Sequence, residues 1–200
     1  VASQYNDYHP VFSHDGRWLY FNSDRPISES MEPFKKMNIW RVKYSGSWGE
    51  PEYLSSINSG HHESYPALSE DYLYFNSDRP GGKGSMDIYR SKITHDLLEP
   101  PVLVPELNSL NSENDLTIHP AGKVLVLNRY HLEDQTLDLY ISRLVGETWT
   151  EPELLSDLNA SNVWELTPTF SASGKMFYYE VDGQVKCILT HRIEKVQTDR

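Results

Sequence analysis

The sequence predicts an all-β protein, a β-propeller with four blades in this chain. Three observations support this prediction. A unit of about 50 residues occurs four times, each unit contains short strand-forming segments, and turns rich in Gly, Pro and Asp separate them. Short strands joined by tight turns pair antiparallel. A four-stranded unit that recurs at this interval is typical of a propeller blade, because stacked blades bury faces that one blade leaves open.

The repeat is anchored on one position in each unit, and the steps between anchors are 56, 50 and 52 residues. The anchors are Pro10, Pro66, Leu116 and Pro168. Three residues before each anchor stands an acid: Asp7, Glu63, Glu113 and Glu165. A turn and an apolar strand follow each anchor, as in Asp15-Gly16 and Trp18 to Phe21. The sequence therefore predicts one domain over residues 1–200, with repeats at approximately 7–58, 63–108, 113–159 and 165–196.

The later strands of each unit are also recognisable. A strand opening with Asn or Asp begins at Asn38, Asp87 and Asp138, and a further short strand follows a Glu-Pro step in the same three copies. The fourth copy lacks the Glu-Pro step, so only Ile193 to Val196 remains for its last strand. Closure is therefore left open: the chain forms either a closed four-bladed ring or a partial or permuted propeller.

Composition excludes several classes of function. Acidic residues outnumber Lys and Arg by 29 to 18, for a formal charge of −11, and nucleic-acid binding needs the opposite balance. No apolar run approaches the ~20 residues that cross a bilayer, so no membrane insertion is expected. The N-terminal residues carry no signal peptide in the sequence as given. The single cysteine, Cys187, rules out an intramolecular disulfide.

The repeat resembles a known family. Glu63 to Tyr89 contains Pro-Ala-Leu-Ser, then Leu-Tyr-Phe-Asn-Ser-Asp-Arg-Pro, then Asp-Ile-Tyr, and Trp-x-Glu-Pro-x-x-Leu follows in two copies. This pattern resembles the TolB-type, WD-like propeller repeat, in the form found with OmpA-like bacterial envelope proteins. The resemblance implies a propeller, binding of protein partners, and a bacterial periplasmic or extracellular location. The chain departs from TolB in having four repeats instead of six and no separate N-terminal domain.

The repeated acids are the first candidate site. The segment entering the innermost strand of a blade lies at the mouth of the central channel, where carboxylates and nearby histidines would bind a ligand or a cation. The predicted site residues are Asp7, His9, His62, Glu63, Glu113 and Glu165. The alternative is that each carboxylate caps backbone N–H groups of its own loop. No cofactor is expected beyond a cation in the channel.

Two further sets have structural and functional interpretations. Arg25 and Arg79 are expected to pair across a hairpin with the residues that open the next strand, Asn38 and Asp87. His9, His61 and His62 are not repeated between blades, which is typical either of a function added to a scaffold or of exposed loop histidines. Trp164 and Tyr65 flank two of the acids, as aromatic side chains do in carbohydrate or peptide sites and also on any exposed propeller face.

These observations favour non-catalytic binding of a protein, peptide or glycan on the channel face. The chain has no Gly-x-Ser-x-Gly nucleophile motif. The alternative is a hydrolase or lyase that acts on polysaccharide through the channel-mouth carboxylates. An unclosed ring would leave open blade edges, so a homo-oligomer is expected in that case.

Overall fold

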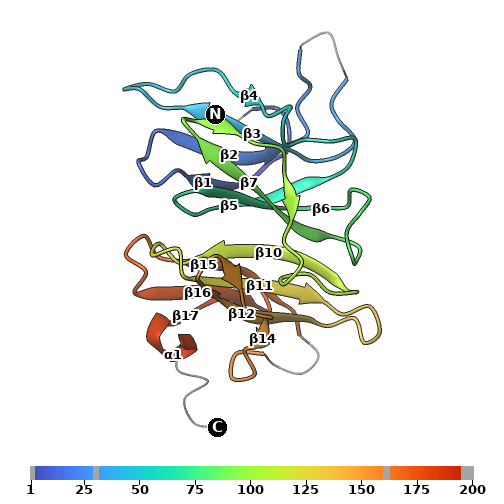
Figure 1. The fold of residues 1–200 in the computed structure, drawn as a ribbon, viewed down its shortest axis with the longest axis vertical. Helices are drawn as coiled ribbons and strands as arrows, with labels where there is room; N and C mark the ends of the chain where they lie inside the picture. The colour runs from blue at the N-terminus through green and yellow to red at the C-terminus, as the bar shows by residue number, and fades with distance from the viewer. Residues whose placement is uncertain (1–2, 29–31, 160–162, 195–200) are drawn as a thin grey trace. The chain divides into compact units, whose positions relative to one another are not determined.

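The computed structural model describes residues 3–28, 32–159 and 163–194. These residues form four antiparallel sheets and one short helix, which confirms the all-β prediction (Figure 1). The chain divides into two compact units, each holding two sheets. Unit 1 comprises Val1–Gly82 with Ile88–Leu103, and unit 2 comprises Lys83–Asp87 with Val104–Arg200. Within the described residues, no helix is long and apolar enough to cross a membrane.

Unit 1 contains the first two sheets. The first sheet has the order β1-β2-β3-β4 and contains β1 (Asp7–Phe12), β2 (Trp18–Ser23), β3 (Asn38–Lys43) and β4 (Glu52–Tyr53). The second has the order β5-β6-β7-β8, with β9 also paired to β7. It contains β5 (Glu63–Leu68), β6 (Tyr72–Ser77), β7 (Asp87–Thr94), β8 (Leu97–Leu98) and β9 (Val102–Leu103).

Unit 2 contains the other two sheets. The third has the order β10-β11-β12-β13, with β14 also paired to β12. It contains β10 (Ser112–Ile118), β11 (Val124–Tyr130), β12 (Leu137–Val145), β13 (Thr148–Trp149) and β14 (Glu153–Leu154). The fourth has three strands in the order β15-β16-β17, which are β15 (Glu165–Phe170), β16 (Met176–Val181) and β17 (Gln184–Leu189).

The end of the fourth repeat differs from the prediction. A fourth strand was expected from Ile193 to Val196, but Ile193 lies in the helix α1 (Thr190–Glu194), and residues 195 and 196 lie outside the described residues. The helix buries Ile193 in the core of unit 2. Without a Glu-Pro segment to pair with β17, burial of this one apolar side chain outweighs strand formation.

The core of each unit lies between its two sheets. In unit 1, buried side chains from both sheets meet in one cluster: Tyr20, Ile39, Leu54, Ile57, Leu73, Phe75 and Tyr89. In unit 2, the corresponding cluster contains Val124, Val126, Leu139, Ile141, Leu155, Phe177 and Ile193. Successive side chains of a strand point to opposite faces, and β2, β3 and β6 are buried at five of their six positions, so both faces of these inner strands are covered.

Candidate functional site

The first strand of every sheet carries a β-bulge at the same position of the repeat. The register with the second strand shifts between Tyr8 and Val11, Ser64 and Ala67, Glu113 and Leu116, and Leu166 and Thr169. A bulge sets two residues opposite one and redirects a side chain, often beside a functional site. The residue just before each anchor lies in this bulge. These bulge residues are His9, Tyr65, Asp115 and Thr167, a different residue type in each blade.

Three of the four bulge residues have a strained backbone. His9, Tyr65 and Thr167 have φ values of 51°, 53° and 47°, in the left-handed region that side chains other than glycine rarely occupy. Each precedes a proline, whereas Asp115 precedes Leu116 and is not among the positive-φ residues. A proline disfavours the right-handed helical region for the residue before it. Backbone strain of this kind concentrates at ligand and active sites.

In unit 1 the bulges of two blades bring an imidazole and a phenol together. The ring centroids of His9 and Tyr65 lie 4.3 Å apart, and both side chains are half-buried. Nδ1 of His9 lies 3.4 Å from Nδ2 of the buried Asn22. Burial lowers the pKa of His9, which favours the neutral form of its imidazole. The pair therefore offers ring faces together with uncharged hydrogen-bonding groups.

In unit 2 the bulges bring a carboxyl group to a backbone amide. The backbone N–H of Thr167 donates to Oδ2 of Asp115 at 3.0 Å. Desolvation of the buried Asp115 raises its pKa to about 6, although hydrogen bonds from Thr167 and the Asn128 side chain oppose the rise. A carboxyl group with a pKa near 6 can accept or donate a proton near neutral pH.

The acids Glu63 and Glu113 have the same structural surroundings in their blades. Each is fully buried, and each accepts hydrogen bonds from the backbone N–H and the hydroxyl of a serine four residues earlier, Ser59 or Ser109. Loop capping, the alternative stated above, is therefore observed for both acids. Whether they also bind a ligand stays a prediction.

The other two acids have different partners. Oδ1 of Asp7 pairs with Nη2 of Arg25 at 2.7 Å. Burial of Asp7 tends to raise its pKa, but hydrogen bonds from Arg25, Ser23 and Ser3 outweigh that effect and hold the pKa below its ordinary value. Glu165 is fully buried, and the residue opposite it on the neighbouring strand is Val181. The residue opposite Glu63 is a serine, and the residue opposite Glu113 is an arginine.

The expected partners of the arginines are corrected by these contacts. Arg79 donates to Glu63 at 3.0 Å and lies over the rings of Phe75 and Tyr89, so it does not pair with a strand-opening residue. The carboxylate of Asp87 instead accepts N–H groups of the preceding loop. The arginine side chain turns back across the sheet because the repeated acid and the aromatic faces together satisfy its charge.

The predicted histidines and tryptophan lie near the ends of the first strands. Nδ1 of His62 accepts a hydrogen bond from the backbone N–H of Met37, and the backbone N–H of His62 donates to the carboxylate of Asp78. That carboxylate also lies 3.6 Å from Nδ1 of His61. Trp164 is half exposed, and its Nε1 donates to the backbone carbonyl of Gln135. Within the described part of the chain, no three His, Cys, Asp or Glu side chains are grouped to hold a metal ion.

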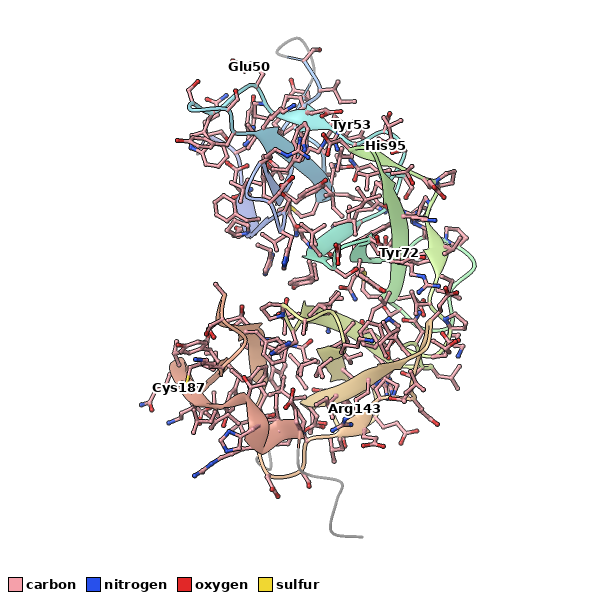
Figure 2. The ribbon with its side chains drawn as sticks, turned by 60° about the vertical axis from the view of Figure 1, so that its left-hand side comes forward. Glu50, Tyr53, Tyr72, His95, Arg143 and Cys187 are labelled. Carbon is pink, nitrogen blue, oxygen red and sulfur yellow. The ribbon has the colours of Figure 1, made fainter. Side chains whose placement is uncertain are left out.

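A separate cavity of about 400 Å³ lies in unit 1, beside the β1–β2 and β7–β8 turns. Its lining includes His14, Trp18, Glu70 and His95 (Figure 2 labels His95). None of the bulge residues lines it.

Sequence reasoning missed Asp115 and Arg129. Nε of Arg129 pairs with the buried Glu113 at 2.8 Å, as Arg79 pairs with Glu63. Arg129 lies directly opposite Glu113 on the neighbouring strand, whereas the residue opposite Glu63 is Ser77. A signal for Asp115 was present, since it occupies the same offset from its anchor as His9 and Tyr65.

No family model and no curated protein matches the chain. Solved structures do match: prolyl oligopeptidase B of Galerina marginata has a TM-score of 0.63 at 10% identity, covering 94% of this chain and 25% of that one. A gluconolactonase of Xanthomonas campestris has a TM-score of 0.62 at 12% identity, with coverages of 92% and 56%. An endo-arabinase of Bacteroides thetaiotaomicron has a TM-score of 0.56 at 16% identity, with coverages of 90% and 73%.

The fold is a β-propeller. Its four antiparallel blades and its similarity to propeller proteins establish this fold. Because the sequence identities are low, the similarity supports the fold alone. The chain spans about a quarter of the prolyl peptidases and about half of the gluconolactonases that it matches. These similar propellers are mostly enzymes by name. The link to TolB and OmpA-like proteins stays a prediction.

Proposed function

We propose that unit 1 of this propeller binds a neutral glycan through its bulge residues, His9 and Tyr65. The observation that carries the proposal is that these positions vary between blades, while the surrounding frame of acids, arginines and strands repeats. A purely architectural position would recur with the same residue type, as the acid three residues before the anchor does.

The chemistry of the bulge residues suits a sugar. A ring face such as that of Tyr65 packs on the apolar C–H face of a pyranose or furanose, and its hydroxyl and the imidazole of His9 bond to sugar hydroxyls. The formal charge of −11 disfavours an anionic ligand. Several similar propellers are named for work on carbohydrates, among them gluconolactonases, an arabinofuranosidase, an endo-arabinase and a sialidase.

The proposal is tested by calorimetric titration of the purified protein with neutral arabino-oligosaccharides, gluconolactone and a sialylated oligosaccharide. Binding of a neutral saccharide is expected, with affinity reduced at least tenfold in the Tyr65→Ala variant. His9→Ala is paired with His14→Ala, a control in an exposed turn outside the bulges that should leave affinity unchanged. The neutral-glycan proposal would be refuted if the protein bound only the sialylated compound. It would also be refuted if the protein bound unstructured peptides and none of the saccharides.

A second candidate function is catalysis on a glycan at the bulge residues of unit 2, Asp115 and Thr167. The raised pKa of Asp115 favours it, because a buried carboxyl group that is part protonated near pH 6 can transfer a proton to a glycosidic oxygen. Reducing-end assays on arabinan would then show turnover that disappears in Asp115→Asn while saccharide binding persists. If the wild type binds the saccharide but forms no product, catalysis is excluded and binding remains the proposed function.

The predicted channel residues lie beside the bulges of their own units along the chain. Asp7, His62 and Glu63 in unit 1, and Glu113 and Glu165 in unit 2, precede the bulge residues by two or three positions, and Glu63, Glu113 and Glu165 are fully buried. Glu63 and Glu113 would then act chiefly by holding the first strands in place. A periplasmic or extracellular location, expected from the sequence resemblance, is compatible with a glycan ligand.

A further inference from the structure

The cavity of about 400 Å³ in unit 1 lies between blades 1 and 2, which are the first and second sheets. Blade 1 contributes its β1–β2 turn together with Trp18 and Tyr20 of β2. Blade 2 contributes Leu68, Ile93 and the β5–β6 and β7–β8 turns. Every residue of the lining belongs to unit 1, so the cavity is formed by that unit alone. Its volume is in the range of small-molecule sites.

In unit 2 a side chain occupies the corresponding position between blades 3 and 4. Ser13 and His119 each stand three residues after their anchor, and the backbone N–H of each donates to the residue that opens the second strand. The imidazole of His119 reaches blade 4, where its Nε2 lies 3.1 Å from the carbonyl oxygen of Gly174. The same ring packs edge-on against Phe170, with centroids 5.2 Å apart. Phe170 is the equivalent of Leu68, because both end the first strand of their blade and pair with the second residue of the next strand.

Two differences between the blades therefore account for the cavity. Unit 1 has Ser13 and Leu68 where unit 2 has His119 and Phe170, and the smaller side chains leave space between the sheets. The position of His119 shows that an aromatic ring fits between two neighbouring blades of this repeat. The cavity in unit 1 has room for a ring that a ligand supplies.

The β7–β8 turn brings strained residues to the cavity. His95 and Asp96 have φ values of 51° and 64°, whereas the corresponding turns of blades 1 and 3 have glycines, Gly46 and Gly146, in the left-handed region. Both strained residues line the cavity (Figure 2 labels His95), and Oδ1 of Asp96 lies 3.3 Å from Nη2 of Arg17 in blade 1. Backbone strain of this kind concentrates at ligand sites.

The charges of the lining favour a cation. Three carboxylates line the cavity, those of Asp15, Glu70 and Asp96, together with the guanidinium of Arg17. Arg17 pairs with Asp15 and Asp96, whereas no ion pair within the described residues involves Glu70. A positively charged group is therefore attracted to the cavity, and the exposed carboxylate of Glu70 is available to it.

Two cations lie over Trp18 without lining the cavity. The guanidinium of Arg41 is 4.1 Å from the centroid of the Trp18 ring, and it donates two hydrogen bonds to the carboxylate of Glu52, which balances its charge. Nζ of Lys43 lies 5.2 Å from the same ring. Lys43 offsets one of the lining carboxylates, and the carboxylates remain in excess.

We propose that this cavity binds a small amine, whose apolar ring enters between blades 1 and 2 and whose ammonium group pairs with Glu70. The ring contacts Trp18 and Leu68, in the place that the His119 imidazole takes in unit 2. None of the bulge residues lines the cavity, so this site is separate from the proposed glycan site.

Titration with three probes of one shape tests the proposal. The probes are phenethylamine, phenethyl alcohol and hydrocinnamate, which carry a positive, a neutral and a negative group on the same phenylethyl body. Amide chemical shifts of the ¹⁵N-labelled protein should show saturable binding of the amine, with shifts concentrated at Ser13, Ser69 and His95. The alcohol should bind more weakly, and hydrocinnamate more weakly still. Equal affinities for the three probes, or no saturable shifts with the amine, would overturn the proposal.

Two variants test the ring and the ammonium group separately. Ser13→His introduces the side chain that stands at this position in unit 2, and it should abolish amine binding. Glu70→Gln should weaken amine binding by about threefold, because one exposed ion pair is lost, and should leave the affinity for phenethyl alcohol unchanged. The control Glu50→Gln removes an exposed carboxylate of unit 1 outside the lining and should bind the amine like the wild type.

The variants also give the contrary outcomes. Circular dichroism checks that each variant is folded. A folded Ser13→His variant that binds the amine as tightly as the wild type would show that the ring does not enter between the blades. Equal losses of affinity in Glu70→Gln and Glu50→Gln would show only a general attraction to an acidic protein. Either result would overturn the proposal, and the Glu70→Gln result stands even if Ser13→His does not fold.

Discussion

The rings of His9 and Tyr65 lie 4.3 Å apart, although the two residues come from different blades and are 56 positions apart in the chain. Both have left-handed backbones at the same bulge, and a third bulge residue, Thr167, shares that conformation. The strained backbone conformation is therefore the same at the bulge of these three blades, whereas the side chain at that position differs.

The strain at Thr167 predicts a stabilising substitution. A left-handed residue other than glycine costs about 1–2 kcal/mol, more than the ~0.5–1 kcal/mol that glycine costs through backbone entropy. Thr167→Gly should therefore raise the free energy of unfolding by about 0.5–1 kcal/mol, as measured by urea denaturation. Thr169→Gly, on the same strand without a positive φ, should lower it by about the same amount. Destabilisation of both variants alike would show that Thr167 is not strained.

The buried pair of Glu63 and Arg79 predicts a large loss on truncation. Removing one partner of a buried ion pair leaves the other charge uncompensated and typically costs about 3–5 kcal/mol. Glu63→Ala should therefore lower the unfolding free energy by an amount in that range, because Arg79, Ser59 and Ser77 lose their acceptor. The exposed control Glu70→Ala should change it by less than about 0.5 kcal/mol. Equal, small effects in the two variants would argue against a structural role for Glu63.

Asp115 predicts a pH dependence of stability. Its pKa is raised in the folded protein, from 3.8 to about 6, so the folded state holds the proton more tightly than the unfolded state. The penalty for the ionised carboxylate is absent below pH 4 and grows as the pH rises from about 4 to 6. A rise of this size corresponds to roughly 3 kcal/mol.

The measurement compares the wild type with Asp115→Asn, which cannot ionise. The variant should gain stability relative to the wild type as the pH rises through that window, with the difference constant above about pH 7. Urea denaturation at pH 4.5, 5.5 and 7 gives the difference. A gap between the two proteins that does not change with pH would contradict the raised pKa.

Two glycines with nearly the same backbone conformation distinguish the cost of backbone strain from the cost of a side-chain clash. Gly174 and Gly122 have φ values of 71° and 70°, but a Cβ on Gly174 would lie 2.2 Å from Nε2 of His119, whereas a Cβ on Gly122 meets nothing within 4 Å. Gly122→Ala should cost about 1 kcal/mol through strain alone. Gly174→Ala should cost a further ~1–3 kcal/mol, because His119, which donates from Nε2 to the Gly174 carbonyl, must move. Equal losses of melting temperature would refute the close contact.

The sequence predicted the scaffold better than the contacts within it. Strands and turns follow from local patterns such as Leu73 to Phe75 after a turn, and the all-β propeller is confirmed. The partner of Arg79 was mispredicted because a long side chain reaches across the sheet to a residue 16 positions away, which periodicity does not encode. The helix at Thr190–Glu194 was missed because burial of Ile193, a tertiary effect, decides the conformation of five residues.

The candidate site shows the same division. His9 was predicted because it is a histidine that does not repeat, whereas Asp115 was hidden by its neighbour Glu113, which fits the repeated acid pattern. The backbone of the bulge and the burial of Asp115 arise only when β10 pairs with β11 and the Thr167 amide reaches its carboxylate.

The central claim is that the bulge residues bind a neutral saccharide. Amide chemical shifts of the ¹⁵N-labelled protein during titration with arabino-oligosaccharides test it most directly. We predict saturable shifts that concentrate at residues 9 and 65 of unit 1 and their strand neighbours. Shifts confined to the cavity lined by His14 and His95, or no shifts at any saccharide concentration, would contradict it.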